Sequence, residues 1–332
     1  MFTVGKPASL RILAVRLGAM GDIIHALPAV ASIKLAHPEC QLTWLVEPKW
    51  AALLDSNPYV DRVLFLERES VSGLFRTGRA LSNLRCDWAV DFQGLYKSAV
   101  SAVAAQPERL YGFDASQVRE RGAAVFYTHR VFAQAAHVVD RNLELAAALP
   151  GSPAQTAGAA AFPLPEGAPE GDLPEGDFVL ASPLAGWGAK QWPLDHYQAL
   201  AARLLDECGV PLVLNCPPGV PLPNLMPARI HHSSLAGLIH ATRRAAAVVG
   251  VDSGPLHLAA ALSRPGAAIF GPTDPARNGP YGSSLHVLRS PAAPTTYKRG
   301  SAIHPSMRQI SPAQVFDSLK ATLNQFAGAA RP

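Results

Sequence analysis

Cysteine is scarce in this 332-residue sequence, which has four, at Cys40, Cys86, Cys208 and Cys216. They form no CxxC pair and no cluster with histidine, so the pattern indicates reduced thiols in a cytoplasmic protein. Uninterrupted runs of 18 or more apolar residues are absent, so we expect no membrane-spanning helix. The opening "MFTVGKPASL" lacks a long apolar core and a small-residue cleavage pattern, and we expect no secretory signal.

Charge of either sign is also sparse, since charged residues make up 16% of the chain and the net charge is +4. This mild excess falls short of a nucleic-acid footprint and suits an anionic small molecule or a phosphorylated surface. The sequence contains no DxD, HExxH, GxGxxG, GxxxxGK[ST] or GxSxG motif. These absences argue against several metal, dinucleotide, P-loop and hydrolase sites, and we expect neither a bound metal nor a cofactor.

Apolar residues, by contrast, make up 48% of the chain, enough for two buried cores. Strand-like runs such as "RILAVRLG", "QLTWLVE" and "WAVDFQG" alternate with helical stretches, and the second half repeats the pattern with "FVLASP", "PLVLNC" and "AAVVGVDS". This alternation predicts the α/β class, with two Rossmann-like domains and ligands at the carboxyl ends of the strands, facing a cleft between the domains. We expect the domains at 1–155 and 178–325, joined by a Pro- and Gly-rich linker at 156–177.

The helix predicted from "LDHYQALAARLLDECG" has its apolar residues at helical spacing and stops at Gly209. Pro193 suits the first turn of this helix. The residues expected on its buried face are Tyr197, Leu200, Leu204 and Leu205.

An acid follows the first strand in "LAVRLGAMGDIIHALPAV", which runs from Leu13 to Val30. Gly18 and Gly21 allow a tight turn, and Asp22 then lies in the first turn of a helix that we expect to continue to Ala36. An ionised carboxylate at the end of a parallel strand can accept a proton from a hydroxyl nucleophile. An ordinary helix cap is the commoner role for an aspartate at such a position, and the pattern alone leaves both open.

Two stretches of the second half can bind an anion. In "ASPLAGWGAKQWPLDHY", Lys190 lies on a loop between a strand and a helix, where it either pairs with a phosphate or is simply solvated. In "AAVVGVDSGPLHLAAAL", a strand ends at Asp252, Ser253 and Gly254 turn the chain, and the start of an apolar helix offers N–H groups to an anion. His257 on this helix either faces the ligand or is buried for structural reasons.

Cations of the first half suggest a second anionic partner. Lys97 and Arg119 each follow a strand, and further arginines can join them in a basic wall, although scattered arginines are equally well explained as a solvated surface. The additional members of the predicted wall are Arg62, Arg68, Arg76, Arg79 and Arg121. The stretch from Arg68 to Arg85 mixes arginine with leucine and phenylalanine, and is either an interfacial helix at a membrane or an ordinary surface helix.

The stretches "RLGAMGDIIHALPAV", "DFQGLYKSA", "KQWP", "VDSGPLHLAAAL" and "GPTDP" resemble the bacterial ADP-heptose:lipopolysaccharide heptosyltransferases, glycosyltransferase family 9, and the resemblance runs from Arg11 to about Leu319. It implies a GT-B fold and inverting, metal-independent transfer of L-glycero-D-manno-heptose from ADP-heptose to the Kdo of Kdo-lipid A. It also implies a cytoplasmic protein that touches the inner membrane peripherally.

The resemblance also assigns roles to individual residues. Asp22 corresponds to the general base, and Gly18 and Gly21 to a phosphate loop. It places the donor on Lys190, Asp252, Ser253 and Gly254, and the acceptor on Lys97 and Arg119. We add His257 and Thr273 as candidate donor residues and Arg62 as a candidate acceptor residue. The chain departs from the family where Gly18 and Ala19 replace a frequent hydroxyl residue, and where "NCPPGVPLPN" lacks an acid often found near the ribose.

Three other functions remain open at this stage. A related family member could use another core acceptor or nucleotide sugar. A nicotinamide-dependent oxidoreductase would use Glu47, at the end of the second strand, as its ribose-binding acid, although GxGxxG is missing. A sugar-nucleotide-binding protein without activity is the third.

Overall fold

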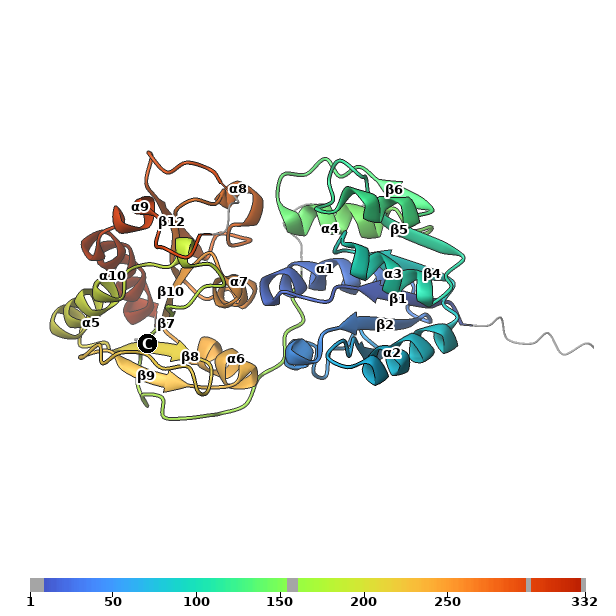
Figure 1. Ribbon diagram of the computed structural model, residues 1–332. Coiled ribbons are helices and arrows are strands. Elements are labelled where there is room, and N and C mark those ends of the chain that lie inside the picture. The colour runs from blue at the N-terminus through green and yellow to red at the C-terminus, as the bar shows by residue number, and fades with distance from the viewer. Residues whose placement is uncertain (1–8, 154–160, 297–299, 330–332) are drawn as a thin grey trace, which may run out of the picture. The chain divides into compact units, whose positions relative to one another are not determined.

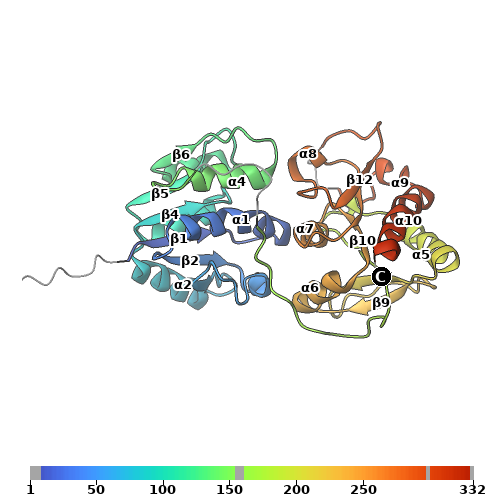
Figure 2. The same ribbon diagram turned by 180° about the vertical axis from the view of Figure 1, so that it is seen from behind.

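A computed structural model describes residues 9–153, 161–296 and 300–329 of the chain (Figures 1 and 2). The chain divides into two units, Met1–Leu164 and Pro165–Pro332. Residues 154–160, which include part of the predicted linker, lie outside the described residues. Each unit contains a six-stranded parallel sheet with helices packed against it.

The sheet of the first unit has the strand order β3-β2-β1-β4-β5-β6. Its central strand β1 is hydrogen-bonded on both sides, and Ile12 is in register with Leu42 of β2 and Trp88 of β4. Leu13, like the rest of the strand interior, is fully buried, as a strand covered on both faces requires. The strands are β1 Arg11–Val15, β2 Gln41–Val46, β3 Arg62–Phe65, β4 Trp88–Asp91, β5 Arg109–Phe113 and β6 His129–Val131.

Helices cover both faces of this sheet. Helix α1 packs against α4 on one face, and α2, α3 and the 3-10 turn η2 contribute to an apolar cluster with β1 on the other. The helical elements are α1 Met20–Ala36, η1 Pro48–Leu53, α2 Val71–Leu84, α3 Tyr96–Ala104, η2 Arg121–Phe126 and α4 Val138–Ala147. Helix α1 begins earlier than predicted, so that Gly21 already lies inside it, and Asp22 occupies its first turn as expected.

The sheet of the second unit has the order β12-β11-β10-β7-β8-β9, which is the same topology. The strands are β7 Val179–Ser182, β8 Leu212–Cys216, β9 Arg229–His232, β10 Ala247–Val251, β11 Gly266–Phe270 and β12 Leu285–Arg289. The helical elements are η3 Gly188–Lys190, α5 Leu194–Cys208, α6 Leu235–Arg244, α7 Gly254–Ala261, α8 Pro275–Asn278, α9 Pro305–Arg308 and α10 Pro312–Ala329.

Helix α5 packs with α10 over one face of the second sheet. Tyr197, Leu200 and Leu204 are buried as predicted, and the helix ends at Gly209, whose φ of 68° suits a residue without a side chain. The prediction for Leu205 is wrong, because its side chain is 42% exposed. At about 100° per residue it lies roughly a quarter-turn from the buried stripe. Pro193 precedes the helix instead of lying in its first turn.

Both sheets confirm the predicted α/β class with two Rossmann-like halves. In each, the first strand lies beside the fourth, β1 beside β4 and β7 beside β10, and this is where the strand order reverses. Loops leaving the carboxyl ends of such strands diverge and leave room for a ligand. Strand β6 was not predicted, because it has only three residues and no apolar run.

Candidate active site

Asp22 is held in one orientation by two contacts in the first unit. Its Oδ1 lies 2.7 Å from Nη2 of Arg16, and its Oδ2 accepts a hydrogen bond of 3.1 Å from the backbone N–H of Ala19. Arg16 is buried and also donates to the carbonyl of Phe92, whereas the Asp22 side chain is 46% exposed. The carboxylate therefore both caps α1 and presents an accessible edge at the carboxyl end of β1.

The loop between β1 and α1 is pressed against neighbouring side chains at Gly18. A Cβ at this position would lie 2.7 Å from Nε1 of Trp50 and 3.7 Å from Oε2 of Glu47. The absence of a side chain therefore lets Trp50 and Glu47 pack directly against the loop.

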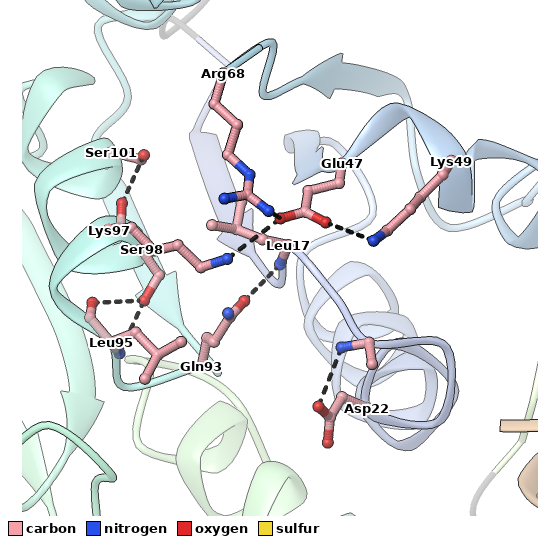
Figure 3. A network of polar contacts seen from close by, with 11 residues as sticks. Leu17, Asp22, Glu47, Lys49, Arg68, Gln93, Leu95, Lys97, Ser98 and Ser101 are labelled. Carbon is pink, nitrogen blue, oxygen red and sulfur yellow. Dashed lines mark hydrogen bonds and ion pairs between the residues drawn. The ribbon is translucent and has the colours of Figure 1, made fainter. Parts of the chain in front are cut away.

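The loop after β4 is organised by the buried Asp91, which sequence analysis did not select. Its carboxylate accepts hydrogen bonds from the backbone of Gln93 and Gly94 and from the hydroxyls of Ser98 and Tyr127. Burial raises the pKa of Asp91 more than these donors lower it. The fixed loop positions the Gln93 side chain, whose Oε1 accepts a hydrogen bond from the backbone N–H of Leu17 (Figure 3). This hydrogen bond joins the loops that follow β1 and β4. The sequence pattern that could have identified Asp91 is a polar residue at the end of an apolar strand.

Three cations surround Glu47, the residue that follows β2 (Figure 3). Its Oε1 lies 3.1 Å from Arg68 and 3.2 Å from Lys97, and its Oε2 lies 3.4 Å from Lys49. Burial raises the pKa of Glu47, but the hydrogen bond and charge of Lys97, with the charges of Arg68 and Lys49, outweigh it and lower the pKa overall. A carboxylate occupied in this way is poorly placed to bind a ribose.

Three further members of the predicted basic wall do not join this cluster. Arg119 is exposed between β5 and η2, where the neighbouring Glu120 accepts the backbone N–H of Tyr96 at the start of α3. Arg76 is paired with Glu67. Arg62 begins β3 in register with Thr43 and therefore lies at the amino edge of the sheet, away from Lys97, where it lines a hollow of about 430 Å³ with other residues of 51–65.

In the second unit, Lys190 and Asp252 form a nearly buried ion pair. Lys190 Nζ lies 2.6 Å from Oδ2 of Asp252, and their side chains are 15% and 6% exposed. Because β7 and β10 are neighbours, the loops after them bring the two residues together at the carboxyl edge of the sheet. The ammonium also lies 4.3 Å above the ring of Trp187, which lines a hollow of about 500 Å³ with the residues Gly186, Gly188, Gln191, Gly300 and Ser301.

Helix α7 begins directly beside this pair. Gly250 lets the helix approach β10, because a Cβ there would lie 2.8 Å from the Leu256 side chain. His257 Nε2 lies 3.5 Å from Oδ1 of Asp252. The hydroxyls of Ser253 and Thr273 are buried and have no hydrogen-bond partner within the described part of the chain. Ser253 and Gly254 open the helix as predicted, and Thr273 follows β11, the next strand in the sheet.

The Asp252 pair predicts how stability depends on pH. Burial raises the pKa of Asp252, but the hydrogen bond from His257 and the charge of Lys190 outweigh it and hold the pKa well below its usual range. A carboxyl with a lowered folded-state pKa contributes stability that is complete above its unfolded pKa of about 4 and is lost as the pH falls below it. In chemical denaturation, the difference between wild type and Asp252→Asn should stay constant from pH 7 to about 5 and shrink below pH 4. A difference that grows on acidification would contradict this.

Among the described residues, no group of three or more His, Cys, Asp or Glu side chains could hold a metal ion. Within the same ranges, no helix is long and apolar enough to cross a membrane.

Comparisons with known proteins extend these observations. A family model described as glycosyltransferase family 9 (heptosyltransferase) matches residues 74–304. Lipopolysaccharide heptosyltransferase 1 of Escherichia coli K12 is 31% identical over 310 residues, which cover 85% of this chain and 94% of that protein. The structure of E. coli heptosyltransferase WaaC with ADP superposes with a TM-score of 0.75 at 27% identity, covering 94% of this chain and 100% of that one. The structure of WaaC with ADP-2-deoxy-2-fluoro heptose superposes with a TM-score of 0.73 at 26% identity, covering 94% of this chain and 99% of that one.

The fold is thus that of a two-domain glycosyltransferase, as the resemblance implied. The family model spans more than half of the chain, and a relative above 30% identity is covered almost completely. The chain belongs to glycosyltransferase family 9, the heptosyltransferases.

Proposed function

We propose that this enzyme transfers L-glycero-D-manno-heptose from ADP-heptose to the Kdo of Kdo-lipid A in the lipopolysaccharide inner core, with inversion and without a metal ion. The observation that carries the proposal is the geometry of Asp22, a half-exposed carboxylate held by Arg16 and a backbone N–H at the carboxyl end of β1. The similarity to lipopolysaccharide heptosyltransferase 1, and the ADP and ADP-2-deoxy-2-fluoro heptose bound to E. coli WaaC, support the choice of donor and acceptor.

In the proposed reaction, Asp22 takes the proton of an acceptor hydroxyl as its oxygen bonds to the anomeric carbon of heptose. The bond from that carbon to the β-phosphate oxygen breaks, and ADP leaves with the electron pair. Lys190 and the N-terminus of α7 then stabilise the charge of the leaving diphosphate. Ser253 and Thr273 offer buried hydroxyls to the donor, and His257 holds Asp252, while Lys97 and Arg119 attract the anionic acceptor.

Transfer by purified enzyme is the direct test. ADP-heptose and Kdo-lipid A should give a product heavier by one heptose in mass spectrometry, with unchanged yield in the presence of a chelator. Parallel reactions with other nucleotide sugars, and with acceptors that already carry heptose, distinguish the related-transferase alternative. Failure to transfer from any nucleotide sugar would contradict the proposal and favour a binding protein. The oxidoreductase alternative has lost its supporting residue, because Glu47 is engaged by three cations.

The lipid acceptor implies peripheral contact with the cytoplasmic face of the inner membrane, and helix α2 is the proposed contact. Val71, Leu74 and Phe75 lie at helical spacing on its first turns and are 72%, 49% and 77% exposed. Arg79, one helical turn beyond Phe75, is exposed and would face anionic lipid headgroups.

Phe75→Ser should weaken co-sedimentation with anionic vesicles by about tenfold or more, because burying a phenylalanine contributes about 1.5–3 kcal/mol. Leu35→Ser is the matched control, since Leu35 is 61% exposed on α1 of the same unit. Equal effects of the two substitutions, or none from Phe75→Ser, would remove α2 from this role.

A further inference from the structure

The cluster around Glu47 combines a buried acid with exposed cations. The Glu47 side chain is 11% exposed, whereas those of Lys49, Arg68 and Lys97 are 63%, 55% and 40% exposed. The carboxylate therefore lies beneath the cations, and their outer N–H groups remain available to solvent. One negative charge among three positive charges leaves a net positive surface.

These cations come from separate parts of the chain. Lys49 follows Glu47 in η1, Arg68 lies between β3 and α2, and Lys97 lies in the first turn of α3, 50 residues after Glu47. The strand order β3-β2-β1-β4 means that the Glu47–Lys97 contact passes across the carboxyl end of β1. From that end the chain continues through Gly18 to Asp22, so Asp22 and the cluster share one edge of the sheet (Figure 3).

Placing three long cationic side chains close together is unfavourable, because like charges repel and ordering each side chain costs conformational entropy. Exposed ion pairs alone contribute little, but a shared, largely buried carboxylate restricts all three ammonium and guanidinium groups at once. Preorganised cations bind an anion without the cost of ordering them when it arrives.

From this arrangement we infer that Glu47 is a positioning residue, which gathers Lys49, Arg68 and Lys97 into one subsite for an anionic group of the acceptor. The inference rests on the proposed function, since it assumes an acceptor whose hydroxyl reaches Asp22. A sugar carboxylate and a phosphate share the chemistry that such a subsite recognises. The acceptor offers both, so the experiment must tell them apart.

Glu47→Gln tests the inference, because a positioning role and a merely neutralising role of Glu47 predict opposite changes in the acceptor KM. If Glu47 only neutralised the cations, its removal would strengthen anion binding and lower the acceptor KM. If it positions them, the acceptor KM should rise about tenfold or more, as expected when binding groups are misplaced, while kcat and the donor KM change less than twofold. Glu47→Asp, which keeps the charge, should recover part of the loss. An unchanged or lowered acceptor KM would overturn the inference.

Matched variants separate positioning from a general loss of structure. Glu67→Gln removes a carboxylate that pairs with Arg76 in the same unit, and should leave the acceptor KM unchanged. Because Glu47 acts through Lys97 as well as through Lys49 and Arg68, Glu47→Gln combined with Lys97→Gln should raise the acceptor KM by less than the product of the two single effects. Multiplied effects, or a loss of thermal stability that raises both donor and acceptor KM, would mean that Glu47 does not act by positioning.

Two further measurements identify the anion and distinguish failure of the inference from failure of the proposed function. The first uses an acceptor that lacks the lipid A phosphates. With this acceptor, Glu47→Gln should still raise the acceptor KM if the subsite binds the Kdo carboxylate, and should have no effect if the subsite binds phosphate. Direct binding of Kdo-lipid A to enzyme without donor is measured in parallel. If the wild-type enzyme binds Kdo-lipid A but transfers no heptose to it, only the proposed function is contradicted. If the Glu47→Gln variant binds Kdo-lipid A as tightly as the wild type, only the inference is contradicted.

Discussion

Asp22→Asn should lower kcat by about a hundredfold or more, with donor and acceptor KM nearly unchanged. The amide keeps the size of the side chain and an oxygen for the backbone N–H of Ala19, but it has no lone pair basic enough to take a hydroxyl proton. Initial-rate measurements with ADP-heptose and Kdo-lipid A give kcat and both KM values. Circular dichroism and thermal unfolding check that the variant is folded.

Asp61→Asn is a close control for this substitution. Asp61 also pairs with one cation, Lys34 at 2.8 Å, and accepts one backbone N–H, from Leu42 at 2.7 Å. Its side chain is 43% exposed, nearly the same as that of Asp22, but it lies just before β3, at the other edge of the sheet. Loss of this carboxylate should leave kcat within about twofold. Comparable kcat for Asp22→Asn and wild type would assign Asp22 to helix capping alone.

Lys190→Ala should weaken ADP binding about 10- to 100-fold, because a charge-assisted hydrogen bond contributes about 1.5–3 kcal/mol. The same substitution should lower the free energy of unfolding by about 3 kcal/mol, since it removes the cation that lies 2.6 Å from the buried carboxylate of Asp252. Calorimetric titration with ADP and urea unfolding measure the two effects separately. Lys320→Ala removes an exposed cation of the same unit, paired with Glu207, and should change neither by much.

A double variant separates the binding effect from the stability effect. Lys190→Ala with Asp252→Asn removes both charges, so no unpaired carboxylate stays buried, and most of the lost stability should return. ADP binding should stay weak, because the cation is still missing. Recovery of ADP affinity together with stability would show that Lys190 acts only by holding the fold.

Much of the fold could be predicted from local patterns. Apolar runs bounded by turn residues identify strands such as β1 and β10, and helical spacing identifies α5 down to its stop at Gly209. The errors lie where tertiary packing overrides the pattern. Leu205 is apolar but falls at the margin of the packed stripe, and β6 exists because β5 offers it backbone partners, not because its own residues are apolar.

The candidate site was predictable in its parts but not in its contacts. Asp22 and Asp252 each close or follow an apolar strand, which is a local signal, and the family resemblance selected Lys190. The same reasoning placed Arg62 with Lys97, but parallel register puts Arg62 at the opposite edge of the sheet. Arg16 was missed because a single charge within a strand-like run has no distinctive spacing. Asp91 was missed although it closes β4, which is the same kind of local signal as that of Asp252.

By itself, the sequence determined the alternation of strands and helices, the two Rossmann-like halves and the acids at the strand ends, because periodicity and turn chemistry are local properties. Only the tertiary structure decided which charges meet. Arg16 holds Asp22, Lys190 holds Asp252, and Glu47 gathers three cations because the strand order places their loops side by side. Electrostatic pairing depends on distance in space, and chain folding sets that distance independently of separation along the sequence.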